Sequence, residues 1–314
     1  MHTSSSCLAA ALLLLGCAGS TTPATTAAST TDGAVDAALD ADASGASDAA
    51  APDISDAAPD ASHATDATVT GDAGGATRVI GYDGIARWDA LASAERAKVG
   101  VFRSAFLHKS VGQDLEDGIN ANGFATDYIT SDATITAPGI SGGLFTTNNG
   151  DGVGKIAEWR GMALRNGSTR LRVAIMKFGY AEVTGDLAPI EAAYASAVQA
   201  VQAAGMRVVH VTPPLIFNDP ADDAFKMQLR TWMLGAFPND VIFDLMDVES
   251  TDPTTGRRCE RGGSWEICDN VRSTSTCASL GQGVDAPSGQ GHLCATQAER
   301  IAKAFLMAIY EAGR

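Results

Sequence analysis

The first 77 residues contain neither lysine nor arginine, and after residue 17 they carry few large apolar side chains. Residues 18–77 instead hold ten Asp among Ala, Ser, Thr and Gly. A segment with charge of one sign and little apolar surface cannot offset by burial the conformational entropy lost on folding. We therefore expect residues 17–77 to form a disordered tether and residues 78–314 to form the folded domain.

Positive charge is too scarce for a nucleic-acid partner. The formal net charge is −15, and the ten tether Asp supply most of it. From residue 78 onward, 22 basic residues face the 27 acidic ones that remain of 37. A mildly acidic domain without a basic patch excludes nucleic-acid binding, and its length suits one domain with a sizeable core, which we expect to be monomeric.

A short apolar run lies ahead of the tether. Residues 7–17 read CLAAALLLLGC, which is too short to span a bilayer but fits a signal peptide over residues 1–16. Leu14-Leu15-Gly16-Cys17 resembles the lipobox of bacterial lipoproteins, which implies acylation of Cys17 and a lipid bilayer as partner. Ala18 and Gly19 lack the acidic residue of inner-membrane retention, so the resemblance favours the outer membrane. The alternative is an ordinary cleaved signal peptide, because no Lys or Arg precedes the apolar run.

The remaining cysteines indicate disulfides rather than metal. In an exported domain four cysteines predict two disulfides with three possible pairings, and none of their spacings is the short pair that structural zinc prefers. Phosphate-cradling glycine loops and clusters of metal ligands are also missing from the sequence, so we expect neither cofactor nor metal. These four are Cys259, Cys268, Cys277 and Cys294.

Short runs rich in Val, Ile and Phe alternate with stretches of helical period, which predicts an α/β fold. We expect a three-layer α/β/α sandwich around a mostly parallel five-stranded sheet, with ligands at the carboxyl ends of the strands. The predicted strands span 99–107, 125–130, 171–178, 206–212 and 240–246. The predicted helices span 87–97, 112–121, 153–165, 187–204, 221–236 and 295–312.

Ser110 is the candidate nucleophile, because it follows an apolar strand and precedes Gly112 and a predicted helix. Backbone N–H groups at such a turn can hold a developing oxyanion. A serine needs a base within hydrogen-bond reach. His292, just before the last helix, is the candidate base, whereas we expect His108 to support the turn and His210 to be a core residue.

Five segments in order carry a family resemblance. They are FLHKSVGQDLEDGI, NNGDGVGKIAEW, AIMKFGYAEV, HVTPPL and FDLMDVEST. Together with a late His before a terminal helix, they resemble a poorly characterised bacterial branch of the SGNH (GDSL-like) hydrolase superfamily, in which a His precedes Ser-Val-Gly. The resemblance implies a flavodoxin-like sheet, Ser110 as nucleophile with its own N–H as an oxyanion donor, and His292 as base.

Two positions depart from the family pattern. Gly289 stands three residues before His292, where the family has its Asp, so Asp285 is the candidate third catalytic residue, with Asp247 and Glu249 as alternatives. Ala181 stands where an oxyanion-binding Asn is expected, with Asn148 as one possible substitute. The candidates for oxyanion or substrate binding are Gly112, Asn149, Lys177 and Tyr180.

The sequence therefore predicts an envelope lipoprotein with serine esterase activity on a small-acyl or glycan ester, a substrate class suggested by fold analogy. The rival interpretation is a non-catalytic module that binds a glycan or a protein in the same crevice, and a third is a purely structural lipoprotein. On either of these, Ser110 is only a helix N-cap and His292 a surface loop residue.

Overall fold

The computed structural model describes residues 78–287 and 290–314, apart from the side chains of 168–170. The predicted signal peptide, Cys17 and the tether lie outside the described residues. The strands are β1 (Val79–Ile80), β2 (Arg103–His108), β3 (Thr126–Tyr128), β4 (Gly139–Leu144), β5 (Val173–Lys177), β6 (Arg207–Val211), β7 (Val241–Phe243), β8 (Glu260–Arg261) and β9 (Ser264–Trp265). The helices are α1 (Asp83–Ala90), α2 (Ser93–Arg96), the 3-10 helix η1 (Ala97–Gly100), α3 (Val111–Ala121), α4 (Gly152–Arg170), α5 (Ala188–Ala203), α6 (Pro220–Ala236), α7 (Leu245–Glu249) and α8 (Ala295–Gly313). Across this part of the chain no helix has the length and apolar character needed to cross a membrane.

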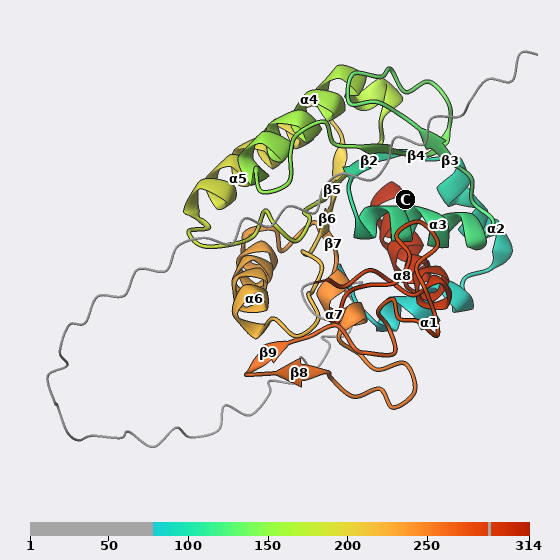
Figure 1. Cartoon of the computed structure of the whole chain (residues 1–314). Coiled ribbons are helices and arrows are strands. Elements are labelled where there is room, and N and C mark those ends of the chain that lie inside the picture. Colours follow the sequence, from blue (N-terminus) through green and yellow to red (C-terminus); the bar gives the residue numbers. More distant parts are fainter. Residues whose placement is uncertain (1–77, 288–289) are drawn as a thin grey trace, which may run out of the picture. The chain divides into compact units, whose positions relative to one another are not determined.

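A parallel sheet forms the centre of the fold (Figure 1). Its strand order is β1-β7-β6-β5-β2-β4-β3, and every neighbouring pair is parallel. The predicted α/β class is confirmed, but the sheet has seven strands. The prediction of five was wrong because it missed the two-residue β1 and the glycine-rich β4.

Strand β4 reads GISGGL, a composition that disfavours a strand. Its glycines are needed because neighbouring groups occupy the space of a side chain. A Cβ at Gly142 would lie 1.4 Å from the Glu116 carboxylate, and one at Gly143 would lie 2.0 Å from the carbonyl oxygen of Ile129. Tight packing therefore outweighs the local propensity at this strand.

Helices cover both faces of the sheet and form two separate cores. Helices α1, α3 and α8 lie on one face, and α4, α5 and α6 lie on the other (Figure 1). Helices α3 and α8 pack closely because Gly118 has no side chain; a Cβ there would lie 2.1 Å from the carbonyl oxygen of Ala298. This close contact places the start of α8 beside α3.

Most predicted elements are present, with shifts at their ends. The predicted helix over 87–97 was wrong, because Ala92 is extended and separates α1 from α2. The strand predicted from residue 99 begins at Arg103, since residues 97–100 form η1. The last helix is confirmed with its buried apolar stripe.

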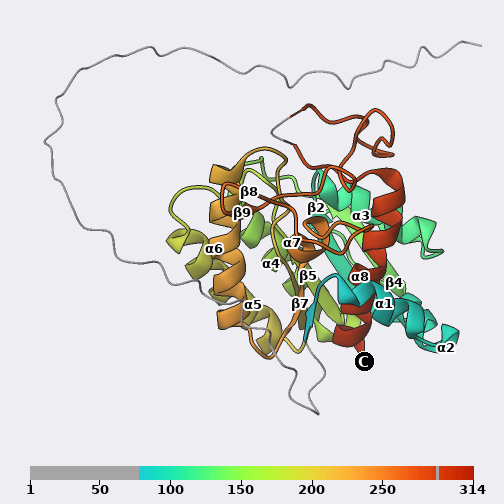
Figure 2. The same ribbon diagram turned by 90° about the horizontal axis from the view of Figure 1, so that it is seen from below.

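Two disulfides staple the C-terminal loops between α7 and α8. Cys259 pairs with Cys268 and Cys277 with Cys294, which confirms the two predicted disulfides and selects one of the three pairings. Figure 2 shows the loop that precedes α8 lying beside α3. The loop regions therefore converge at the carboxyl ends of the strands.

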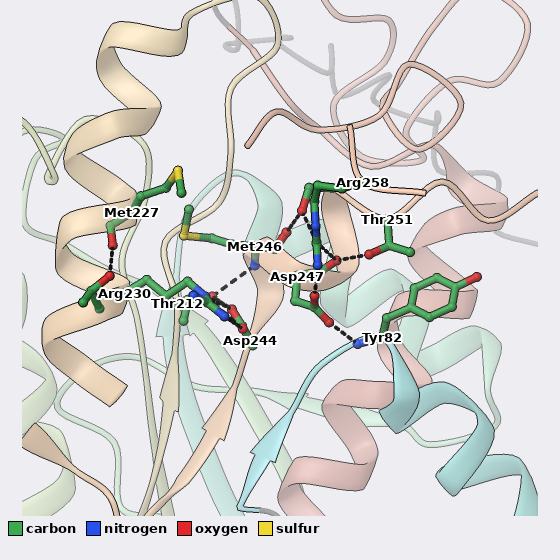
Figure 3. Close-up of polar contacts among 11 residues, drawn as sticks. Tyr82, Thr212, Met227, Arg230, Asp244, Met246, Asp247, Thr251 and Arg258 are labelled. Atoms are coloured by element: carbon green, nitrogen blue, oxygen red, sulfur yellow. Dashed lines mark hydrogen bonds and ion pairs between the residues drawn. The ribbon is translucent and has the colours of Figure 1, made fainter. Parts of the chain in front are cut away.

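Two ion pairs lie just after β7: one binds helix α6 and the other binds the C-terminal loops (Figure 3). Arg230 of α6 binds the Asp244 carboxylate with Nη2 at 2.6 Å, and Thr212 donates to the same carboxylate. Asp247 binds Arg258, next to Cys259, and accepts the N–H of Tyr82 at 2.7 Å. Asp247 is thus engaged in structural contacts here, which argues against its predicted alternative role as the third catalytic group.

Candidate active site

Ser110 lies at a strained turn between β2 and α3. Its φ of 57° and ψ of −122° fall outside the regions that most L residues adopt, and it is one of two non-glycine residues with positive φ among those the structure describes. Residues held in such conformations cluster at functional sites. Ser110 occupies the N-cap position of α3, as the alternative interpretation expects, but its side chain makes no cap hydrogen bond.

Gly112 permits this turn through its lack of a side chain. A Cβ at Gly112 would lie 2.2 Å from the Cβ of His108, so helix α3 approaches the end of β2 only because of the glycine. The Gly112 N–H donates to the carbonyl oxygen of Lys109 at 3.1 Å. The prediction that Gly112 supplies an oxyanion donor is corrected accordingly, because its N–H is used within the turn.

His292 meets Ser110 across 182 positions of sequence. Its Nε2 lies 3.0 Å from the Ser110 Oγ, and the imidazole is buried rather than on the surface. This distance lies within the range expected of a nucleophile and its general base. The two residues predicted to converge do so.

Asp114, not Asp285, lies against the other ring nitrogen. The Asp114 Oδ2 is 3.1 Å from Nδ1 of His292 and accepts the Leu293 N–H at 3.0 Å. Asp285 instead accepts the backbone N–H of His292 at 2.8 Å. Burial raises the pKa of the Asp285 carboxyl, against the opposing effects of the His292 charge and of this hydrogen bond. Asp285 therefore holds the loop, and the position beside the ring belongs to Asp114.

The other alternative acid, Glu249, is also used elsewhere. Its Oε2 accepts the Leu215 N–H at 2.7 Å, and its side chain is fully buried. Burial raises the pKa of the Glu249 carboxyl well above its ordinary value, although the Leu215 N–H and the charge of Lys177 act against this. Glu249 supports the backbone after β6.

Tyr180, just after β5, lies against the Ser110–His292 pair. Its ring makes an edge contact with the His292 ring, with centroids 6.0 Å apart, and its oxygen accepts the Gly291 N–H at 3.2 Å. Burial raises the pKa of the phenol well above its usual value, the charges of Glu249, Asp114 and Asp285 act in the same direction, and a hydrogen bond with the Ser110 side chain opposes them. These surroundings therefore favour the neutral form of the phenol.

Asn149 and Lys177 lie further from the pair. Asn149 Oδ1 accepts from Lys155 Nζ at 3.0 Å, and Lys155 in turn binds Glu182 at 2.5 Å. Lys177 is buried and donates to the carbonyl oxygen of Phe178 at 3.0 Å. Within the described part of the chain, no hydrogen bond joins either residue to Ser110.

The buried surroundings of Lys177 change the pKa of its ammonium group. Burial lowers the pKa of the Lys177 ammonium to about 8, against the opposing charges of Glu249 and Glu182. Lys177 is only 2% exposed. Its role in binding stays a prediction.

The other two candidate histidines lie where the sequence placed them. His108 is buried beneath the Ser110 turn, with its Nε2 3.2 Å from Glu116 Oε1. His210 is a core residue that binds Tyr194 at 2.7 Å through Nδ1 and Asp240 at 3.1 Å through Nε2. Neither contacts the Ser110 hydroxyl.

The site lies at the position in the sheet where ligands are expected. Within the sheet, β4 and β3 lie on one side of β2, and β5 lies on the other side of β2. The carboxyl ends of β2 and β5 therefore form the switch point at which open α/β sheets bind ligands. Ser110 follows β2 and Tyr180 follows β5. When the sequence is compared with protein-family models and with curated proteins, it matches none of them.

Proposed function

We propose that this chain is a serine ester hydrolase that acts by acyl transfer. The observation that carries the proposal is the continuous contact from the Ser110 hydroxyl through the His292 imidazole to the buried Asp114 carboxylate, at 3.0 and 3.1 Å. This constellation is recognised by geometry and roles rather than by sequence order. The strained backbone of Ser110 adds independent support.

Each residue of the triad has a defined step. Ser110 Oγ attacks the ester carbonyl carbon while His292 Nε2 takes the hydroxyl proton. As the ester C–O bond breaks, the imidazolium gives that proton to the departing alkoxide, which leaves as an alcohol, and the acyl group stays bonded to Ser110 Oγ. Water, deprotonated by His292, attacks the acyl-serine, and the carboxylic acid departs as Ser110 regains its proton. Asp114 holds Nδ1–H and stabilises the imidazolium in both halves.

Tyr180 takes the place of the missing asparagine as an oxyanion donor. Its oxygen already accepts the Gly291 N–H, so its own hydrogen is directed elsewhere, and its ring lies against the ring of His292, the proposed base. The N–H of Ser110 supplies the second donor, as the SGNH resemblance implies. Two donors aimed at one oxygen suit the charge that develops in the tetrahedral intermediate.

The substrate class and location follow from the same resemblances. An SGNH-like hydrolase on a lipoprotein signal acts on a small-acyl or glycan ester outside the cytoplasm, anchored through an acylated Cys17. Replacement of Cys17 with Ser should move the protein from the detergent phase to the aqueous phase in a phase-separation assay. Retention of the Ser variant in the detergent phase would contradict the anchor.

The catalytic proposal is tested with a chromogenic short-chain ester and an organophosphonate. The purified full chain should release the chromophore and should be labelled at Ser110, as located by peptide mass spectrometry. Ser110→Ala should abolish both, whereas Ser93→Ala, at an exposed serine of α2, should change neither. A non-catalytic binding module would show neither hydrolysis nor labelling in the unaltered chain.

A further inference from the structure

A fourth side chain contacts the triad from outside it. Ser279 Oγ lies 2.5 Å from Asp114 Oδ1, the carboxylate oxygen that does not face His292. Ser279 is buried, and Asp114 is 1% exposed. An ionised carboxylate has no hydrogen to give, so Ser279 is the donor.

The hydrogen of Ser279 is directed at Asp114 by the neighbours of its hydroxyl. The Ser279 oxygen accepts the Gln282 N–H at 3.1 Å, which leaves its own hydrogen for the carboxylate. The Ser279 N–H lies 3.0 Å from both the Gly283 carbonyl oxygen and the Ser273 hydroxyl. The hydroxyl is therefore held in place before any substrate binds.

The same loop holds both Ser279 and His292. Cys277, two residues before Ser279, forms a disulfide with Cys294, two residues after His292. Next to this disulfide, the Ala295 N–H donates to the Ala278 carbonyl oxygen at 3.0 Å. His292 and Ser279 thus come from one disulfide-linked loop, and they contact the two carboxylate oxygens of Asp114.

We propose that Ser279 is a positioning residue that holds Asp114 in place for its contact with His292, so that four side chains are connected in sequence from Ser110 to Ser279. This inference rests on the proposed function for its kinetic consequence, but the contact itself does not. Hydrogen bonds to a carboxylate favour its charged form. Without Ser279, one buried oxygen of Asp114 loses its donor, and the carboxylate holds the imidazole less firmly.

The test compares variants that differ in the hydroxyl alone. Ser279→Ala removes the donor, and the pair Ser279→Thr and Ser279→Val present similar shapes with and without it. Ser264→Ala is the matched control, because Ser264 is buried in β9 and donates to the Pro220 carbonyl oxygen at 3.0 Å, away from the triad. Each variant is measured in the full chain for kcat/KM against pH, and for the proton resonance of the imidazole Nδ1–H that faces Asp114.

Loss of the hydroxyl should reduce kcat/KM about tenfold, because a buried charged acceptor is left unsatisfied. The acid limb of the pH profile should move to higher pH, and the Nδ1–H resonance should shift or broaden. Ser279→Thr should preserve both readouts, Ser279→Val should lose them, and Ser264→Ala should resemble the unaltered chain. If Ser279→Ala does not fold, the Thr and Val pair decides.

An unchanged acid limb and an unchanged resonance in the Ala or Val variant would overturn the role of Ser279. Failure of the proposed function gives a different result, in which the unaltered chain hydrolyses no ester. In that case the Nδ1–H resonance is the only readout. A shift of this resonance in Ser279→Ala and Ser279→Val, but not in Ser264→Ala, supports the contact of Ser279 with Asp114. No shift in either variant refutes it.

Discussion

Replacement of Asp114 by Asn should nearly abolish turnover while preserving the fold. The Asp114 Oδ2 accepts from Nδ1 of His292, which keeps the hydrogen on Nδ1 and leaves Nε2 free to take the Ser110 proton. An Asn amide can present N–H groups to Nδ1 instead, which favours the tautomer with its hydrogen on Nε2. The corresponding change in a well-studied Ser-His-Asp protease reduces kcat roughly 10⁴-fold, about 5.5 kcal/mol of transition-state stabilisation.

Asp285→Asn is the matched comparison, since the two carboxylates flank the same histidine. Among the described residues, Asp285 accepts only the backbone N–H of His292, and the amide oxygen of Asn can accept the same hydrogen bond. We expect a loss below about tenfold for Asp285→Asn. Initial rates on a chromogenic ester, with circular dichroism to confirm the fold, separate the two. A folded Asp114→Asn variant that stays within tenfold of the unaltered rate, or an Asp285→Asn variant that is the more damaged, would refute the assignment.

Three further outcomes are expected. Tyr180→Phe should lower kcat about 100-fold with little change in KM, as loss of one oxyanion donor does, and a normal kcat would remove the phenol from the mechanism. Reduction of the Cys277–Cys294 disulfide should lower the hydrolysis rate before far-ultraviolet circular dichroism changes; an unchanged rate after thiol titration confirms reduction would count against this. Burial raises the pKa of Asp223 to about 7 against the charge of Lys226, so the folded chain keeps a proton that the unfolded chain releases near pH 4. Stability in urea should therefore fall as the pH rises from about 4 to 7, and Asp223→Asn should flatten that slope, whereas parallel curves would contradict the assignment.

Periodicity predicted the elements whose hydrophobic pattern is strong. The stripe along residues 295–312 identifies α8, and the apolar runs identify β5 and β6 to within two residues. The pattern fails at β4, where glycine is required by side chains and backbone from elsewhere in the chain. Such a requirement is tertiary, so local propensity carries no trace of it.

The proposed nucleophile and base were predictable because each follows from its place beside a predicted element. The proposed acid was not, because the family spacing, counted from His292, points to another residue. A usable signal exists in the sequence: Asp114 lies in the first turn of the helix predicted over 112–121, directly after Ser110, so the two lie near each other. The sequence does not show from which direction the His292 imidazole approaches Ser110 and Asp114.

Of the three residues of the proposed triad, only His292 is brought to the site by contacts between distant parts of the chain. Ser110 and Asp114 are fixed relative to each other by a single turn at the start of α3, whatever the rest of the chain does. His292 arrives from 178 positions beyond Asp114, and its location depends on the loop before α8. That loop is tied down by the Cys277–Cys294 disulfide and by backbone hydrogen bonds to Asp285 and Asp114. Because these ties lie in the loop before α8 and outside the sheet, changes to them should reduce catalysis more than they reduce the free energy of unfolding.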